Sequence, residues 1–148
     1  MKKGHLKLTL DPYEWLPGYG ESRVSFRSVG LDVILDINYE KEIFVNNEEA
    51  VLALRREITF NNARCFIREP FPGGAIFEFD GAQGEFGLGK LTEFMDSEWL
   101  SDNLKTWRLA SSQESPTLRH FSIQFLSENS AFDVLAVDVF LSDELPGS

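Results

Sequence analysis

The chain is poor in the residues that most often carry metal, redox or disulfide chemistry. Its 148 residues include one cysteine, Cys65, and two histidines, His5 and His120. A single cysteine cannot form an intrachain disulfide, which favours a reducing compartment, and this set of side chains is too small for a conventional structural zinc site. We therefore expect neither a bound metal nor a cofactor.

Long apolar runs are also missing. No stretch approaches the roughly 20 apolar residues of a membrane-spanning helix. Near the start, Lys7 and Asp11 interrupt the apolar residues that a signal peptide would require. Together with the unpaired cysteine, these features predict a cytoplasmic protein that does not engage membranes.

Basic residues are scarce. Lysine and arginine number 14 against 24 acidic residues, which gives a formal net charge of -10. The excess is concentrated in residues 69–104, where Lys90 is the only base, and in residues 120–148, which have no base. The negative electrostatic field of these residues repels nucleic-acid backbones and favours encounter with a cationic protein. The same charge also keeps a protein soluble without any binding role.

The apolar content is sufficient for one core. Hydrophobic residues make up 43% of the chain and include thirteen phenylalanines, whose rings bury large areas. No internal repeat, low-complexity tract or linker divides the sequence. We therefore expect a single globular domain over residues 1–148, stable without metal or disulfide cross-links.

Alternation of apolar and polar residues predicts about seven strands. The clearest pattern runs over residues 31–39, and the C-terminal residues 121–125 and 132–141 form the strongest predicted hairpin. Residues 63–69 and 75–80 form another, across the Pro and Gly residues between them. The remaining two strands are expected over residues 6–10 and from residue 24.

Two short helices are predicted. Asn46 or Asn47 can cap the first, in which Val51, Leu54 and Ile58 form an apolar stripe. Acidic residues in its first turn and arginines later in it agree with the helix dipole. Asp96 or Ser97 can cap the second helix, whose apolar spacing is carried by Trp99, Leu100, Asn103, Leu104 and Trp107.

These elements indicate an α+β fold with a mainly antiparallel sheet of about seven strands and two short helices. A β-sandwich with helical insertions is the alternative.

Carboxylates on one predicted strand are the candidates for acid and base chemistry. Glu78 and Asp80 are two residues apart and share a strand face, with Glu85 nearby and His120 as a further polar candidate. The segment from Gly84 to Lys90 matches the glycine and lysine spacing of a phosphate-binding loop, but it lacks the hydroxyl residue that holds magnesium. We identify no catalytic residue.

Tryptophans are the candidates for protein recognition, because this residue is enriched at binding hot spots. Trp15 lies in a loop rich in aromatic residues, and Trp99 lies on the second predicted helix. The candidate binding residues are therefore Trp15, Glu78, Asp80, Glu85, Trp99 and His120.

The leading functional hypothesis is a non-enzymatic acidic protein that binds a cationic protein partner. Small, acidic, single-domain chains without motifs are typical of bacterial immunity and inhibitor proteins, which neutralise a partner by complementary charge. Residues 81–102 and the C-terminal hairpin are expected to form the binding surface. One alternative is a small enzyme or ligand-binding domain with a carboxylate-lined pocket, and another is an accessory domain that self-associates into homo-oligomers.

Overall fold

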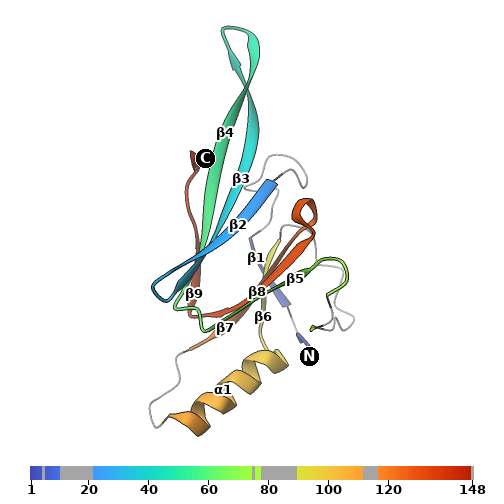
Figure 1. Ribbon diagram of the computed structural model, residues 1–148, viewed down its shortest axis with the longest axis vertical. Coiled ribbons are helices and arrows are strands. Elements are labelled where there is room, and N and C mark those ends of the chain that lie inside the picture. The colour runs from blue at the N-terminus through green and yellow to red at the C-terminus, as the bar shows by residue number, and fades with distance from the viewer. Residues whose placement is uncertain (5, 11–21, 75, 78–89, 112–116, 148) are drawn as a thin grey trace.

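Two five-stranded antiparallel sheets and one α-helix make up the described residues of the computed structural model, which are 1–4, 6–10, 22–74, 76–77, 90–111 and 117–147 (Figure 1). The first sheet has the order β1-β6-β7-β8-β5. Its strands are β1 (Leu6–Leu10), β5 (Cys65–Pro70), β6 (Leu91–Phe94), β7 (Arg119–Phe125) and β8 (Ser130–Ala136). In the second sheet the order is β10-β4-β3-β2, and β9 also pairs with β4. Its strands are β2 (Ser22–Val29), β3 (Asp32–Val45), β4 (Glu48–Asn61), β9 (Asp138–Leu141) and β10 (Leu145–Pro146).

The main hydrophobic core lies between the two sheets. Leu35 and Ile37 of β3 belong to the same buried cluster as Phe121 of β7 and Val134 of β8. All four side chains are fully buried. Each sheet therefore turns one apolar face toward the other, which is the arrangement of a β-sandwich.

Ser97, one of the two caps that the sequence predicts, caps helix α1 (Glu98–Ala110). The Ser97 hydroxyl accepts a hydrogen bond from Leu100 N and so satisfies one of the free amides of the first turn. Trp99 anchors the helix because it is buried together with Leu135, which lies on the face of β8 that points away from the main core. The helix thus covers part of the outer face of the first sheet.

The first predicted helix is wrong. Residues 48–61 form strand β4, which pairs with β3 in one long hairpin. Asn46 and Asn47, predicted as helix caps, have φ values of 54° and 64° and form the two-residue turn between the strands. A two-residue type I′ turn requires positive φ at both central residues, and its twist matches that of the flanking strands. Asparagine adopts positive φ more readily than most other residues do.

The C-terminal hairpin is confirmed, with one change. The predicted strand over residues 132–141 divides at Val137 into β8 and β9, which belong to different sheets. Strand β8 is central in its sheet and buried along its whole length, as its two apolar faces indicate. Of the predicted strand over residues 75–80, Ile76 and Phe77 are not in a strand, and the rest lies outside the described residues.

The expectation of a mainly antiparallel, sheet-rich α+β fold is confirmed. The expected numbers of seven strands and two helices are wrong, because the described residues alone contain more strands and one α-helix. The two facing sheets correspond to the sandwich that the sequence left as the alternative.

Candidate functional site

The β3–β4 hairpin extends beyond the rest of the molecule as a two-stranded arm (Figure 1). Strand β2 pairs with β3 only as far as Tyr39, and β10 pairs with β4 at Leu54 and Arg55. We define the arm as residues 40–53, the part of the hairpin beyond these partners. It carries several exposed apolar side chains, which is unusual for a solvated hairpin tip.

One face of the arm continues the core face of its sheet. Val33, Leu35, Ile37 and Tyr39 alternate along β3 and are buried. Farther along the same face lie Lys41, Ile43 and Val45, opposite Leu52, Ala50 and Glu48. Beyond the edge of the sandwich this apolar stripe loses its cover, and Val45 and Leu52 are 51% and 43% exposed. We call it the apolar face of the arm.

The opposite face of the arm combines acidic and apolar side chains. Phe44 pairs across the hairpin with Glu49, and Glu42 pairs with Val51. Phe44 and Val51 are 73% and 61% exposed, and both glutamates are exposed as well. In this group of four residues, each glutamate therefore has an apolar neighbour both along its strand and across the hairpin. We call this surface the acidic face of the arm.

The arm has an excess of negative charge. It contains four glutamates and one base, Lys41, so its net charge is -3. Lys41 Nζ lies 3.6 Å from Glu144 Oε1, outside the arm. Tyr39 also donates a hydrogen bond to Glu144 Oε2 at 2.9 Å, so this glutamate ties the C-terminal segment to the base of the arm. The carboxylates of the acidic face remain available for a partner.

Below the arm, the charged side chains of the sheet are paired with one another. Arg27 Nε donates to Asp36 Oδ2 at 2.8 Å, and its Nη2 donates to Glu57 Oε1 at 3.0 Å. Arg55 of β4 contacts Asp36 of β3 and Glu57 of its own strand. The network balances its own charge and joins three strands, so the free charge of this sheet is displaced toward the arm.

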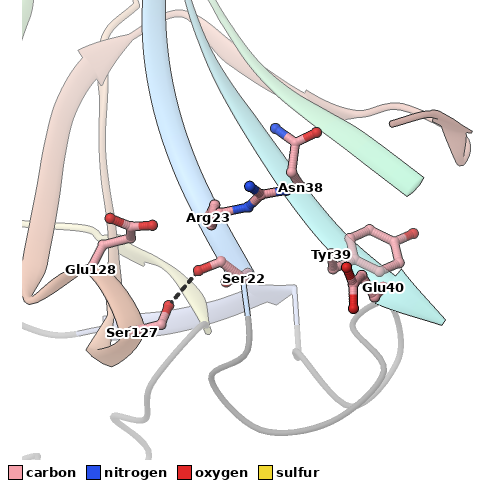
Figure 2. Close-up of a pocket in the computed structure, with 7 residues that line it drawn as sticks. All are labelled: Ser22, Arg23, Asn38, Tyr39, Glu40, Ser127 and Glu128. Carbon is pink, nitrogen blue, oxygen red and sulfur yellow. Dashed lines mark hydrogen bonds between the residues drawn. The ribbon is translucent and has the colours of Figure 1, made fainter. Parts of the chain in front are cut away.

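A shallow polar pocket of about 320 Å³ lies at the base of the arm, where β2 begins and where β3 and β4 continue without it. Figure 2 shows Ser127 and Glu128 on one side, Tyr39 and Glu40 on the other, and Arg23 between them. Its other lining residues are Ser22 and Asn38.

The pocket walls are held by hydrogen bonds. Ser127 Oγ donates to Ser22 O at 2.7 Å, and Glu128 Oε1 accepts from Val24 N at 3.1 Å. Glu40 and the second oxygen of Glu128 extend the acidic surface of the arm toward the body, while Arg23 contributes the opposite charge. The pocket therefore combines two carboxylates with one guanidinium group.

A buried polar cluster lies on the outer face of the first sheet, beneath the start of α1. His120 Nδ1 is 2.8 Å from Ser97 Oγ, and His120 Nε2 is 2.7 Å from Asp133 Oδ1. Lys3 Nζ is 3.2 Å from the same Asp133 oxygen and donates to Ser122 Oγ at 3.1 Å. These five side chains come from four segments that are distant in sequence.

The cluster has the residue types of a catalytic triad but not its accessibility. A nucleophilic serine must reach a substrate, whereas Ser97 is 1% exposed and His120 is fully buried. The imidazole orientation is also opposite to that of the serine protease triad, because Nδ1 faces the serine and Nε2 faces the aspartate. The Ser97 oxygen already accepts from Leu100 N, so the cluster fixes the start of α1 rather than performing chemistry.

Burial lowers the pKa of His120, although the hydrogen bond from the imidazole to Asp133 opposes that shift. The ring is enclosed by the aromatic side chains of Phe77, Phe94 and Trp99, with centroids 5.0–5.4 Å away. Burial also lowers the pKa of Lys3, and the charge of Asp133 opposes it. Neutral His120, with its proton on Nε2, donates to Asp133 and accepts from the Ser97 hydroxyl.

The sequence-predicted site residues fall into two groups. Trp99 and His120 lie together, with ring centroids 5.0 Å apart, but both are buried. Trp15, Glu78, Asp80 and Glu85 lie outside the described residues, as does the glycine-rich segment up to residue 89.

Of the C-terminal hairpin predicted to form the binding surface, β7 and β8 are buried in the middle of their sheet, whereas β9 is partly exposed, with Phe140 at 54%. Sequence reasoning also missed the arm, since its second strand was assigned to a helix. The signal that could have revealed it is the pair Asn46-Asn47 between two apolar segments.

Comparison with other proteins adds no functional information. Among the described residues, no helix is long and apolar enough to cross a membrane, and no three His, Cys, Asp or Glu side chains are grouped as metal ligands. The chain matches no protein-family model, no curated protein and no solved structure.

Proposed function

We propose that the chain is a non-enzymatic binding protein that engages a cationic protein through the β3–β4 arm, in the manner of an immunity or inhibitor protein. The observation that carries this proposal is the acidic face of the arm. There Phe44 and Val51 are mostly exposed and lie beside Glu42 and Glu49, which have no basic partner within the described residues.

The chemistry of that face specifies a basic partner. Lysine and arginine side chains combine an apolar stem with a charged head. A stem of this kind can lie on Phe44 or Val51 while its head reaches Glu42 or Glu49 across the hairpin. A basic surface meets both requirements at once, whereas a nucleic acid or a second acidic protein is repelled.

The net charge of -10 acts over a longer range than these contacts. Acidic fields accelerate the encounter with a basic protein, and this effect weakens as salt shortens the Debye length to about 8 Å at 0.15 M. The apolar contacts act after encounter. Full burial of one such side chain stabilises a complex by about 1.5–3 kcal/mol, and those of the arm are partly buried already, so each contributes about 1–2 kcal/mol.

A second copy of the chain is a less suitable occupant. Self-pairing of two arms would bring their glutamates together, and each arm has a net charge of -3. The carboxylate-pocket enzyme gains no support either, since its acidic residues lie outside the described residues and His120 is buried.

The test uses an arm variant and a matched control. Phe44→Ser with Val51→Ser removes the apolar half of the acidic face. Leu31→Ser with Leu109→Ser removes two side chains that are 72% and 90% exposed elsewhere. Each protein is immobilised and exposed to lysate of its source cells at low and at high salt, and bound proteins are identified by mass spectrometry.

We expect a basic protein to bind the wild type and the control equally, to bind the arm variant more than about tenfold more weakly, and to dissociate at high salt. The charge variant Glu42→Gln with Glu49→Gln should reduce the salt dependence, and Asp102→Asn with Asp143→Asn should not. Capture of no basic protein, or equal capture by the arm variant, contradicts the proposal. A mass that rises with concentration in sedimentation would instead assign the arm to self-association.

A further inference from the structure

A second cavity lies on the outer face of the first sheet. Its volume is about 260 Å³, and it is bounded by the turn after β5, by the N-terminal segment and by the outer face of β7 and β8. The lining residues that matter here are Lys3, Glu69, Phe71, Gly74, Phe77 and Gln124. It is smaller than the roughly 300–1,000 Å³ of typical drug-sized pockets, so it suits a small group.

A buried side chain supplies an unused acceptor to this cavity. Gln124 is 1% exposed, and its Nε2 donates to Ser122 Oγ at 2.9 Å. Its Oε1 is buried and has no hydrogen-bond partner in the protein. Buried carbonyl oxygens are nearly always paired in folded proteins. Gln124 also lines the cavity, so a donor bound there is a candidate partner for this oxygen.

Glu69 supplies a second acceptor. Its Oε2 accepts a long hydrogen bond from Ile76 N, at 3.4 Å, and among the described residues the charge that acts on it is that of Lys3, which lies beyond ion-pair distance. The carboxylate lies directly over Gly74, where an added Cβ would be 2.5 Å from the carboxyl carbon. A side chain at residue 74 would displace the carboxylate, so the glycine leaves room for the carboxylate in this position.

Lys3 and Glu69 are the charged side chains in the lining of the cavity. Lys3 is the one base in its lining, and the Lys3 ammonium is already paired with Asp133 at 3.2 Å. The charge of Glu69 also acts on Lys3, and together Lys3, Asp133 and Glu69 carry one net negative charge. The aromatic rings of Phe71 and Phe77 form part of the wall, and such rings attract cations as well as apolar groups.

From these contacts we propose that the cavity binds a small organic cation, namely a primary ammonium or a guanidinium group. Such a group donates hydrogen bonds to both Glu69 and Gln124 Oε1, balances the remaining charge and packs its carbon atoms against the rings. An anion would meet Glu69 and Asp133 with a single lysine to offset them. The site is independent of the arm and of its proposed partner.

The two sources of such a group are a free small molecule and a lysine or arginine side chain of another protein. Methylguanidinium and n-butylammonium represent the first. Acetyl-Gly-Arg-Gly-amide and acetyl-Gly-Lys-Gly-amide represent the second. Acetate and acetamide, at matched ionic strength, are the anionic and neutral comparisons. Binding is followed by nuclear magnetic resonance from the Gly73 and Gly74 amides and the Gln124 side-chain amide.

We expect saturable shifts of these signals with the cations and none with acetate or acetamide. Removal of a charge-assisted hydrogen bond in Glu69→Gln should weaken binding about tenfold or more. Gly74→Ala should weaken it through displacement of the carboxylate, without a change of charge. Glu49→Gln on the arm is the charge-matched control and should bind as the wild type does.

The two sources are separated by the peptides. Equal affinity for a peptide and for its free cation assigns the site to a protein side chain, and binding of the free cation alone assigns it to a small molecule. The proposal is overturned if no cation shifts the signals, if acetate or acetamide binds equally well, or if Glu69→Gln leaves the affinity unchanged in a variant that unfolds at the wild-type temperature.

Discussion

Acidification should destabilise the fold because it protonates His120. Substitution of this one residue isolates its contribution to the pH dependence of the free energy of unfolding. The imidazole is fully buried, and three kinds of group face it. They are the Asp133 carboxylate of β8, the Ser97 hydroxyl at the start of α1 and the Lys3 ammonium of the N-terminal segment. Burial and the charge of Lys3 both lower the pKa of His120, which Asp133 only partly offsets.

The direction of the effect follows from proton linkage. In the unfolded chain His120 has a pKa of 6.5, and in the folded protein its pKa is lower. Below pH 6.5 the unfolded state therefore binds the proton before the folded state does. The stability associated with the neutral imidazole is complete above pH 6.5 and is lost as the pH falls toward the lower pKa of the folded state. Within that window the loss is about 1.4 kcal/mol per pH unit for one proton.

Urea unfolding between pH 5.5 and 7.5 measures this term when the wild type is compared with His120→Asn. The carboxylates titrate in both proteins and largely cancel in the difference. We expect the free energy of unfolding of the wild type, relative to the variant, to decrease as the pH falls below 6.5. A difference that does not change with pH would refute the assignment of a buried neutral imidazole.

Two further outcomes follow from the same structure. Asp133→Asn leaves the Lys3 ammonium buried without its counter-charge and should lower the free energy of unfolding by about 3–5 kcal/mol, measured by urea titration; a loss below about 1 kcal/mol would contradict the buried pair. In the turn of the arm, Asn47→Gly should preserve the positive φ. Asn47→Val should lower the free energy of local opening of the hairpin by about 1–2 kcal/mol, because a β-branched residue is strained at positive φ. Amide hydrogen exchange should then accelerate in residues 40–53 and not in β7, and faster exchange in β7 as well would show that the arm is not an independent unit.

The clearest limit of sequence reasoning is strand β4. Glu48 and Glu49 at its start and Arg55 and Arg56 later in it agree with the dipole of a helix, and its apolar residues recur at helical intervals. These local preferences amount to tenths of a kcal/mol per residue. They are overridden by the ladder that β4 forms with β3 along the whole hairpin and by burial of Ile58 and Phe60 in the core.

The buried polar cluster shows a second limit. Ser97 was identifiable as a helix cap, because the pattern that follows it has a helical period. Its contact with His120 depends on the packing of α1 over β7, and the contact of Asp133 with Lys3 spans most of the chain. No local pattern reports such a distance, so His120 could be recognised as a polar candidate but not as a buried one.

The sequence by itself determined the acidic charge, the mainly antiparallel character of the fold, the position of α1 to within one residue of its cap, and the pairing of residues 121–125 with the strand that follows. Each of these depends on composition or on neighbours within a few residues. Tertiary structure decided that β8 and β9 join different sheets. It also decided that β3 and β4 extend beyond the strands that pair with them and so form an exposed arm. It also decided that Glu69 and Gln124 meet at one cavity. These features arise from strand pairing and burial between distant segments, whose free energy exceeds the local preferences that a sequence displays.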